Sequence, residues 1–256
     1  MKLSLSVISI FLSYFFCFSY PTELSASSKG RMEFEKTGKV FWDVHTKEKM
    51  VALTFDDGPS SVFTPQILDL LAKYHAKATF FVIGEHAEKF PQIIKRQVDE
   101  GHEIANHTYH HYYSVRKNIK NLNAELKQTS NIIQSIAGYR PSLFRPVGGY
   151  YNENIIHTAI KKDFKIIMWS WHQDTEDWKR PGVNKIVNNV ISDTRPGDII
   201  LMHDAGGNRS QTVKALDEIL AALQKEGYEC VTVSEMLYRA KGILPNPSQL
   251  FPFFNP

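Results

Sequence analysis

The sequence predicts an α/β fold built from repeated β-α units. Short apolar runs alternate with amphipathic stretches from Met50 onward, which is the pattern of strands followed by helices. The chain has 256 residues, a length within the range of a single α/β barrel domain. Hydrophobic residues make up 43% and charged residues 22%, which excludes a disordered or collagen-like chain. Periodicity alone leaves open whether the sheet is open or closed into a barrel.

The N-terminal segment differs in composition from the rest of the chain. After Lys2, residues 3–20 carry no charge and are rich in leucine, isoleucine, valine and phenylalanine, and a small-residue stretch from Ser25 to Ser28 follows. This order is typical of a secretory signal peptide, here cleaved near Ala26. The alternative is an uncleaved membrane anchor, because the uncharged run is nearly long enough to span a bilayer. Both interpretations predict export.

The rest of the chain divides into three segments. Residues 27–48 are polar and are expected to form a leader, with a short strand at 39–42. Residues 49–243 carry the alternating pattern and form the predicted folded domain. Residues 244–256 are rich in proline and phenylalanine without periodicity, so we expect an extended tail on the surface.

The elements of the folded domain are predicted from their hydrophobic periods. The strands are short apolar runs, expected at 50–55, 78–82, 103–105, 143–144, 165–169 and 198–202. The helices are longer amphipathic stretches, expected at 64–74, 91–100, 119–137, 152–162, 183–193, 212–226 and 233–240. In the longest of them, apolar residues recur at the period of a buried helical stripe, namely Leu122, Leu126, Ile132, Ile133 and Ile136.

Charge and cysteine content exclude several classes of partner and scaffold. The 30 basic and 27 acidic side chains give a formal charge of +3 without a dense basic cluster, so we expect no nucleic-acid partner. Two cysteines exclude a disulfide-rich scaffold and a cysteine-built zinc site. Cleavage of the signal peptide would leave Cys230 as the single thiol. No protein partner is indicated, and we expect a monomer.

The unusual polar clusters begin where predicted strands end. The carboxyl ends of parallel strands converge on one face of an α/β fold, where active sites are built. We therefore expect these clusters to meet in space. They are Asp56 to Pro59 after the first strand, Asn106 to His111 after the third, Arg145 and Pro146 after the fourth, and His203 and Asp204 after the last.

Part of this polar set has the composition of a metal site. His107 and His111 are four residues apart, so one helical turn would place both imidazoles on the same side. A carboxylate from Asp56 or Asp57 would complete a set of three ligands with one open position, as a catalytic zinc requires. Adjacent carboxylates are costly unless a cation neutralises one of them. The alternatives are two surface histidines and an ordinary Asp-Gly-Pro turn.

Five motifs in this chain resemble those of the NodB-like polysaccharide deacetylases, the family 4 carbohydrate esterases. The segment 54–59, which reads TFDDGP, resembles the first motif, and 107–111 resembles the H-[S/T]-x-x-H motif. Three weaker matches follow in the family's order, at 145–149, 174–178 and 200–203. The resemblance covers roughly residues 50 to 240 and implies an irregular (β/α) barrel of the polysaccharide deacetylase type. It further implies an enzyme that removes the N-acetyl group from an amino sugar in a polymer.

The resemblance also implies roles for individual residues. A divalent metal would be held by Asp57, His107 and His111, with Zn²⁺ expected first and Co²⁺ or Ni²⁺ as alternatives. Asp56 would be the general base and His203 the general acid.

The resemblance implies further residues that assist the base and the acid or contact the substrate. Arg145 would keep Asp56 ionised, and Asp177 would orient and charge His203. Pro146 and a backbone N–H near Gly148 would face the substrate. Trp178, with Tyr150 and Trp171 as weaker candidates, would stack on sugar rings, although a buried core tryptophan is an equal alternative for Trp178.

The third motif departs from the family pattern. It reads Arg145-Pro146-Val147-Gly148-Gly149, where the family usually has a second proline and an aromatic residue before the final glycine. This change leaves a backbone donor in place but predicts a looser loop and one aromatic side chain fewer in the groove. Substrate choice is therefore less well specified by the sequence than catalysis.

The predicted function is a secreted, metal-dependent N-deacetylase acting on a cell-wall glycan, with peptidoglycan N-acetylglucosamine expected first. We expect the protein to be secreted or associated with the cell wall, with membrane anchoring through the N-terminal segment as the alternative. Three other functions stay open: a chitin or chito-oligosaccharide deacetylase, a catalytically impaired glycan-binding relative, and a metal amidase on small amides. The presence of all the residues with proposed metal and proton-transfer roles counts against the impaired relative.

Overall fold

The computed structural model describes residues 27–112 and 119–244. The signal-peptide prediction (1–26) lies outside the described residues, as does the predicted tail from residue 245 onward. Within the described ranges, no helix is both long and apolar enough to cross a membrane.

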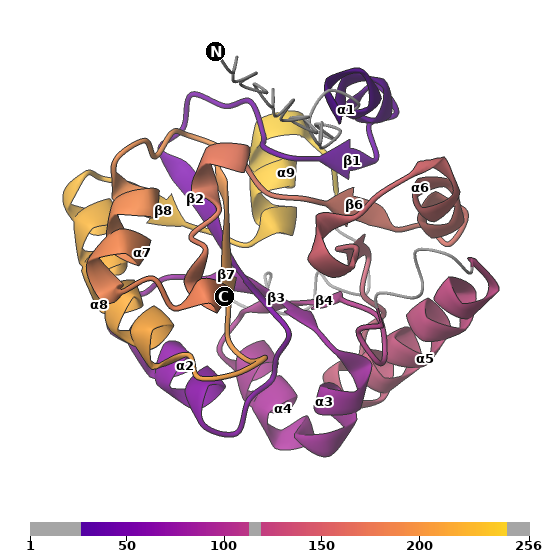
Figure 1. Ribbon diagram of the computed structural model, residues 1–256, viewed down its shortest axis with the longest axis horizontal. Helices are drawn as coiled ribbons and strands as arrows, with labels where there is room; N and C mark the ends of the chain where they lie inside the picture. The colour runs from indigo at the N-terminus through magenta and orange to yellow at the C-terminus, as the bar shows by residue number, and fades with distance from the viewer. Residues whose placement is uncertain (1–26, 113–118, 245–256) are drawn as a thin grey trace, which may run out of the picture.

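A curled sheet of parallel strands forms the centre of the molecule, and helices form a ring around it (Figure 1). Seven strands follow the order β1-β6-β5-β4-β3-β2-β7, and β8 pairs with the start of β2. This arrangement confirms the predicted irregular (β/α) barrel. The two end strands are bridged by loops, through an Asp43–Asp198 bridge and a bond from Ser170 N to the Ile199 carbonyl. The strands are β1 Val40–Phe41, β2 Met50–Asp56, β3 Ala78–Val82, β4 Glu103–Asn106, β5 Leu143–Phe144, β6 Lys165–Ile167, β7 Ile199–His203 and β8 Glu229–Cys230.

The helices match the predicted ones closely, with two additions. All seven predicted helices are present with ends within two residues of the prediction, and α5 has the predicted bounds. The short helices α1 and α3 were not predicted, because α1 is mostly polar and α3 has only six residues. The helices are α1 Ser27–Glu35, α2 Phe63–Lys73, α3 Gly84–Lys89, α4 Pro91–Asp99, α5 Ile119–Ala137, α6 Glu153–Ile160, α7 Val183–Ile191, α8 Ser210–Lys225 and α9 Val233–Lys241.

The segment predicted as a leader is part of the packed fold. Its strand β1 pairs with β6, and Val40 and Trp42 are buried. Arg31 of α1 donates to Asp43 at 2.6 Å, which ties the helix to the sheet. The domain therefore begins upstream of residue 49, since the polar composition of 27–48 conceals one short run of buried residues, Val40, Phe41, Trp42 and Val44.

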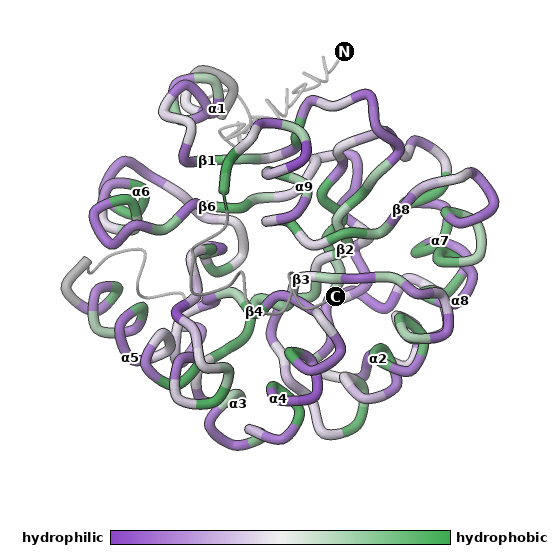
Figure 2. The backbone as a smooth tube through the Cα atoms, turned by 180° about the vertical axis from the view of Figure 1, so that it is seen from behind, coloured by the Kyte–Doolittle hydropathy of each residue, from purple (hydrophilic) through white to green (hydrophobic). Residues whose placement is uncertain are grey.

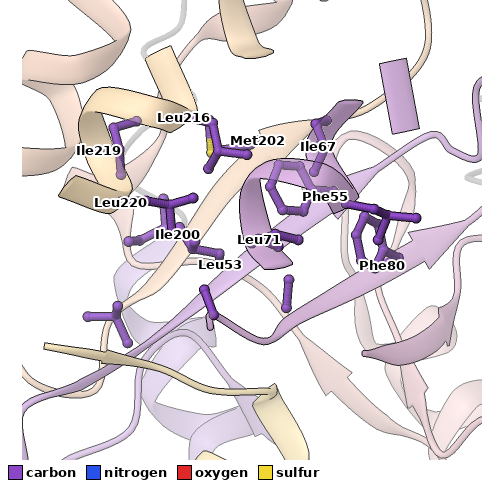
Figure 3. Close-up of a cluster of buried hydrophobic side chains, with 14 of the residues drawn as sticks. Leu53, Phe55, Ile67, Leu71, Phe80, Ile200, Met202, Leu216, Ile219 and Leu220 are labelled. Atoms are coloured by element: carbon purple, nitrogen blue, oxygen red, sulfur yellow. The ribbon is translucent and has the colours of Figure 1, made fainter. Parts of the chain in front are cut away.

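Side chains on the outer face of the sheet form the larger hydrophobic core. Leu53 and Phe55 of β2 point outward and pack with Phe80 of β3 against the surrounding helices (Figure 3). Helix α8 contributes Leu216 and Leu220 to the same cluster. Figure 2 shows hydrophobic residues gathered on the strands and hydrophilic residues on the outer surface of the ring.

Side chains on the inner face change character along the barrel. Met50 and Ala52 of β2 lie in an apolar cluster with Met236 of α9, which covers the end of the barrel where the strands begin. Because side chains alternate along a strand, Thr54 and Asp56 are the next inward-facing residues of β2. The barrel is thus apolar at one end and polar at the other, where the strands finish.

Candidate active site

Two chemically active side chains lie opposite each other at the ends of neighbouring strands. Asp56 ends β2 and His203 ends β7, and the two residues are partners in the parallel ladder. Both border a cavity of about 550 Å³ at the carboxyl end of the barrel. The cavity is lined by Asp56, Asp57, His107, His111, Gly148, Gly149, Trp169, Asp174, Trp178, Leu201, His203, Gly206 and Arg209.

Asp56 is held by a fully buried arginine. Arg145 Nη1 donates to Asp56 Oδ1 at 2.7 Å and to Thr54 Oγ1 at 2.9 Å. Its other nitrogens donate to the carbonyl oxygens of Ile167 and Met168 at 3.0 and 2.8 Å, so the guanidinium is fixed from four sides. A fixed positive charge stabilises a buried carboxylate, which would otherwise be costly to ionise.

Asp57, His107 and His111 form a cluster whose ligand atoms all lie within 4.8 Å of one another. Asp57 Oδ1 is 3.2 Å from His111 Nε2 and 3.7 Å from His107 Nε2. The Nδ1 of His107 is 2.8 Å from the carbonyl oxygen of Arg145, which can only accept, so Nδ1 is the donor and Nε2 is the ring nitrogen that faces Asp57. This second hydrogen bond is typical of histidines that bind a metal.

The chemistry of the cluster fits a divalent cation. Burial, together with the neighbouring His107, lowers the pKa of His111, which favours the neutral imidazole that a metal needs. Two neutral imidazoles and one carboxylate are the donors that catalytic Zn²⁺ sites use. Backbone geometry supports the arrangement, since Asp57 adopts a φ of 75° and its carbonyl is 2.7 Å from His86 Nδ1.

The two histidines are not on a helix, which corrects the predicted helical turn. They lie in the loop after β4, where Thr108 and His111 have φ values of 70° and 57°. Asn106 Oδ1 accepts from the N–H of Thr108 at 2.9 Å, and Glu125 Oε2 accepts from the N–H of His110 at 2.8 Å. Two side-chain acceptors therefore shape the loop so that both imidazoles face Asp57.

His203 is held in a charged state by Asp177. The Nδ1 of His203 donates to Asp177 Oδ1 at 2.7 Å, and Thr212 Oγ1 donates to Asp177 Oδ2 at 2.8 Å. Burial alone would lower the pKa of His203, but the hydrogen bond and charge of Asp177 outweigh it and raise that pKa to about 9. The pKa of Asp177 is lowered in turn, because its bonds to His203 exceed the opposing effect of burial.

The residues predicted to contact substrate divide into two groups. Gly148 and Trp178 line the cavity, and Trp178 is 52% exposed rather than a core tryptophan. Pro146 is buried beneath the turn and Tyr150 is exposed beyond it, so neither lines the cavity. Trp171 also lies outside the cavity and packs against the guanidinium of Arg31, 5.0 Å from its ring centroid.

Several residues of the cavity were not predicted from the sequence. Trp169 borders the cavity beside Gly149, where an added Cβ would lie 2.3 Å from Trp169 Cη2. An aromatic wall is thus present although the third motif lacks its usual aromatic residue. Gly206 and Arg209, in the loop before α8, and Asp174 also line the cavity. The glycine pair Gly206-Gly207, close after the end of a strand, is the sequence feature that could have predicted that this loop borders the site.

Comparison with known proteins identifies the family. A model described as polysaccharide deacetylase matches residues 43–167. A Bacillus cereus protein named peptidoglycan-N-acetylglucosamine deacetylase is 47% identical over 207 residues, which cover 81% of this chain and 97% of the relative. The chain belongs to the polysaccharide deacetylase family. This confirms the predicted resemblance and the prediction that the protein is a hydrolase of this family.

Other relatives in the family differ in their named substrates. Peptidoglycan-N-acetylmuramic acid deacetylase PdaC of Bacillus subtilis is 38% identical over 193 residues, covering 75% of this chain and 40% of that protein. A chitooligosaccharide deacetylase of Bradyrhizobium is 38% identical, covering 71% of this chain and 87% of that protein.

Solved structures of the polysaccharide deacetylase family share the fold. The Bc1960 peptidoglycan N-acetylglucosamine deacetylase superposes with a TM-score of 0.76 at 40% identity, over 80% of this chain and 95% of that one. BA3943 of Bacillus anthracis, described as a CE4 family pseudoenzyme, superposes with a TM-score of 0.71 at 30% identity, over 77% of this chain and 68% of that one. The fold alone therefore does not establish catalysis, which depends on the residues present in the site.

Proposed function

We propose that this chain is a metal-dependent N-deacetylase that hydrolyses the acetamide of N-acetylglucosamine in peptidoglycan. The observation that carries the proposal is that Asp56 and His203, partners at the ends of neighbouring strands, both border one cavity. Each has a fixed partner of opposite charge, at 2.7 Å in both cases. A base and an acid that are each fixed by such a partner, beside a three-ligand cluster, are the parts that amide hydrolysis requires.

The metal would be held by Asp57, His107 and His111, with Zn²⁺ proposed first. When bound, a divalent cation there would polarise the acetamide carbonyl and lower the pKa of a water molecule.

Asp56 is the proposed general base. Arg145 occupies its Oδ1, whereas its Oδ2 is 3.8 Å from His107 Nε2 and faces the cluster. The free oxygen accepts the proton of the water that attacks the carbonyl carbon. The N–H of Gly148, on the cavity wall, is the proposed donor to the oxyanion that forms, because fixed backbone donors stabilise such charge by several kcal/mol.

His203 is the proposed general acid. An amine leaves poorly until it is protonated, so the acid must carry a proton at neutral pH. Asp177 supplies this condition by raising the pKa of His203 to about 9, against the opposing effect of burial. With Nδ1 bonded to Asp177, the Nε2–H of His203 is the proton available to the sugar nitrogen.

Three features support a cell-wall glycan as substrate. The two Bacillus cereus relatives, 47% and 40% identical, are both named peptidoglycan-N-acetylglucosamine deacetylases. Trp178 offers a half-exposed ring beside the cavity, suited to stacking on a sugar face. The apolar segment 3–20 supports export, and we propose that the protein acts outside the membrane, at the wall.

The chitooligosaccharide deacetylase relative makes chito-oligomers the second candidate substrate. The test is acetate release from purified peptidoglycan and from chitin oligomers at matched acetyl concentration, followed by mass analysis of the glycan products. We expect faster release from peptidoglycan, with the lost acetyl groups on glucosamine. Faster release from chitin oligomers, or loss from muramic acid, would contradict the proposed substrate.

A further inference from the structure

The loop between β7 and α8 lies against one oxygen of the Asp57 carboxylate. Gly206 in this loop has a φ of 74°, and a Cβ added to it would lie 2.6 Å from Asp57 Oδ2 and 3.5 Å from Asp57 Cγ. Real Cβ atoms essentially never approach a heavy atom this closely. The other oxygen of Asp57 faces His111 at 3.2 Å. The backbone at Gly206 therefore limits the space open to Oδ2 while Oδ1 faces the imidazoles.

Arg209 fixes the shape of this loop. The residue is only 4% exposed, and it lines the active-site cavity. Nε donates to the carbonyl oxygen of Ala205 at 2.5 Å, and Nη2 donates to that of Gly206 at 3.0 Å. Across the described parts of the chain Arg209 forms no ion pair, so its known bonds go to the loop itself.

We propose that the loop 205–209, pinned by Arg209, is a positioning element for Asp57. By contact at Gly206 it holds the carboxylate with Oδ1 toward His107 and His111. Residues that contact the ligands but not the metal commonly orient metal-binding side chains in this way. The inference rests on the proposed function in one respect, since it takes Asp57, His107 and His111 as the metal ligands.

The primary test is Zn²⁺ affinity of the metal-free protein with alanine at position 206, measured by competition with a chelating dye. We expect Gly206→Ala to weaken Zn²⁺ binding by about 10- to 100-fold, because the new methyl group displaces Asp57 Oδ2. Two control variants separate this contact from backbone strain. Gly138→Ala and Gly227→Ala also lie at positive φ, 80° and 77°, but their Cβ atoms meet nothing within 4 Å.

The two control variants should fold and keep the wild-type Zn²⁺ affinity. Thermal unfolding of each metal-free variant verifies that the protein is folded. Equal affinity in wild type and Gly206→Ala would overturn the proposal, as would an equal loss in all three variants. A wild-type protein that binds no Zn²⁺ would overturn it together with the metal assignment.

A second pair of variants separates the geometry of Arg209 from its charge. A cation beside a divalent metal repels it, so removal of charge alone would tighten Zn²⁺ binding. We expect both Arg209→Gln and Arg209→Lys to weaken binding, because neither side chain reproduces the two guanidinium bonds to the loop carbonyls. Tighter binding in Arg209→Gln would overturn the role of Arg209. Since Zn²⁺ affinity is measured without glycan, failure of deacetylation would be a separate result.

Discussion

Asp177 binds His203 through both the ring and the backbone. Its Oδ1 accepts from His203 Nδ1 at 2.7 Å, and its Oδ2 accepts from the His203 N–H at 2.9 Å. Two bonds to one residue fix the ring orientation as well as its protonation state. Replacement of the Asp177 carboxylate is therefore expected to release the ring orientation of His203 and to lower its pKa.

Asp177→Asn should lower the pKa of His203 from about 9 toward its ordinary value. In the wild type, the acid form is lost as pH rises through the folded pKa, so activity should fall on the alkaline side. In the variant this fall should move to lower pH, and kcat should drop by about 10²- to 10⁴-fold. An NMR titration of His203 and a pH–rate profile measure the two effects. An alkaline limb that does not move would contradict the role of Asp177.

Asp56→Ala should abolish turnover and leave metal binding intact. The reason is that Asp56 pairs with Arg145, whereas Asp57 belongs to the ligand cluster. His107→Ala is the matched variant and should lose both metal and activity. Zn²⁺ content and acetate release report the two properties separately. Loss of metal from Asp56→Ala would mean that the roles of the two aspartates are exchanged.

Gly58→Ala should destabilise the fold, and removal of the Asp204 carboxylate should relieve the effect. A Cβ at position 58 would lie 2.2 Å from Asp204 Oδ2 and 2.3 Å from Oδ1. Overpacking of this kind costs about 1–3 kcal/mol. Chemical unfolding of the two single variants and of Gly58→Ala/Asp204→Ala forms a double-mutant cycle. The double variant should lose less than the sum of the single losses, and simple additivity would show that the two residues do not interact.

Trp178→Ala should raise KM for a polymeric glycan and leave the fold unchanged. The ring is half exposed beside the cavity, and loss of a stacking aromatic costs about 0.5–1.5 kcal/mol, or a few-fold in affinity. Trp171→Ala is the control, because Trp171 is equally exposed but lies outside the cavity. Steady-state kinetics on soluble glycan fragments compare the two. An equal rise in KM for both variants would argue against a specific sugar contact at Trp178.

Stability should fall as pH decreases from about 6.5, because His102 is buried in its neutral form. Burial lowers the pKa of His102 to about 3, and the ring Nδ1 accepts from the N–H of Ala78 at 3.2 Å. Below the pKa of His102 in the unfolded chain, the unfolded chain binds a proton at this residue and the folded state does not. The free energy of unfolding therefore falls by about 1.4 kcal/mol per pH unit. Free energies of unfolding between pH 7.5 and 5 should show a smaller slope in His102→Asn. A slope in His102→Asn equal to that of the wild type would contradict this explanation.

The central part of the fold could be predicted because its signals are local. The apolar run 50–55 followed by two aspartates predicts a strand with a polar end, and β2 has this form. The short strand β8 escaped prediction, since two residues with exposed and half-buried side chains carry no periodic signal.

Prediction of the site was limited by tertiary placement. Trp171 and Trp178 both occupy short polar segments in the sequence, and only the structure shows that one lines the cavity. The spacing of His107 and His111 predicted that the two imidazoles lie close together, and they do. The predicted helical turn was wrong, since side-chain acceptors shape a loop there. Arg209 was missed because its bonds to loop carbonyls depend on backbone conformation rather than residue type.

The most direct test of the proposed function is the metal dependence of acetate release from purified peptidoglycan. The wild-type protein should release acetate as isolated, lose that activity on treatment with a chelator, and regain it when Zn²⁺ is added. The activity should return only in a protein that keeps Asp57, His107 and His111. Acetate release that persists after complete metal removal, or no release with Zn²⁺ demonstrably bound, would contradict the account.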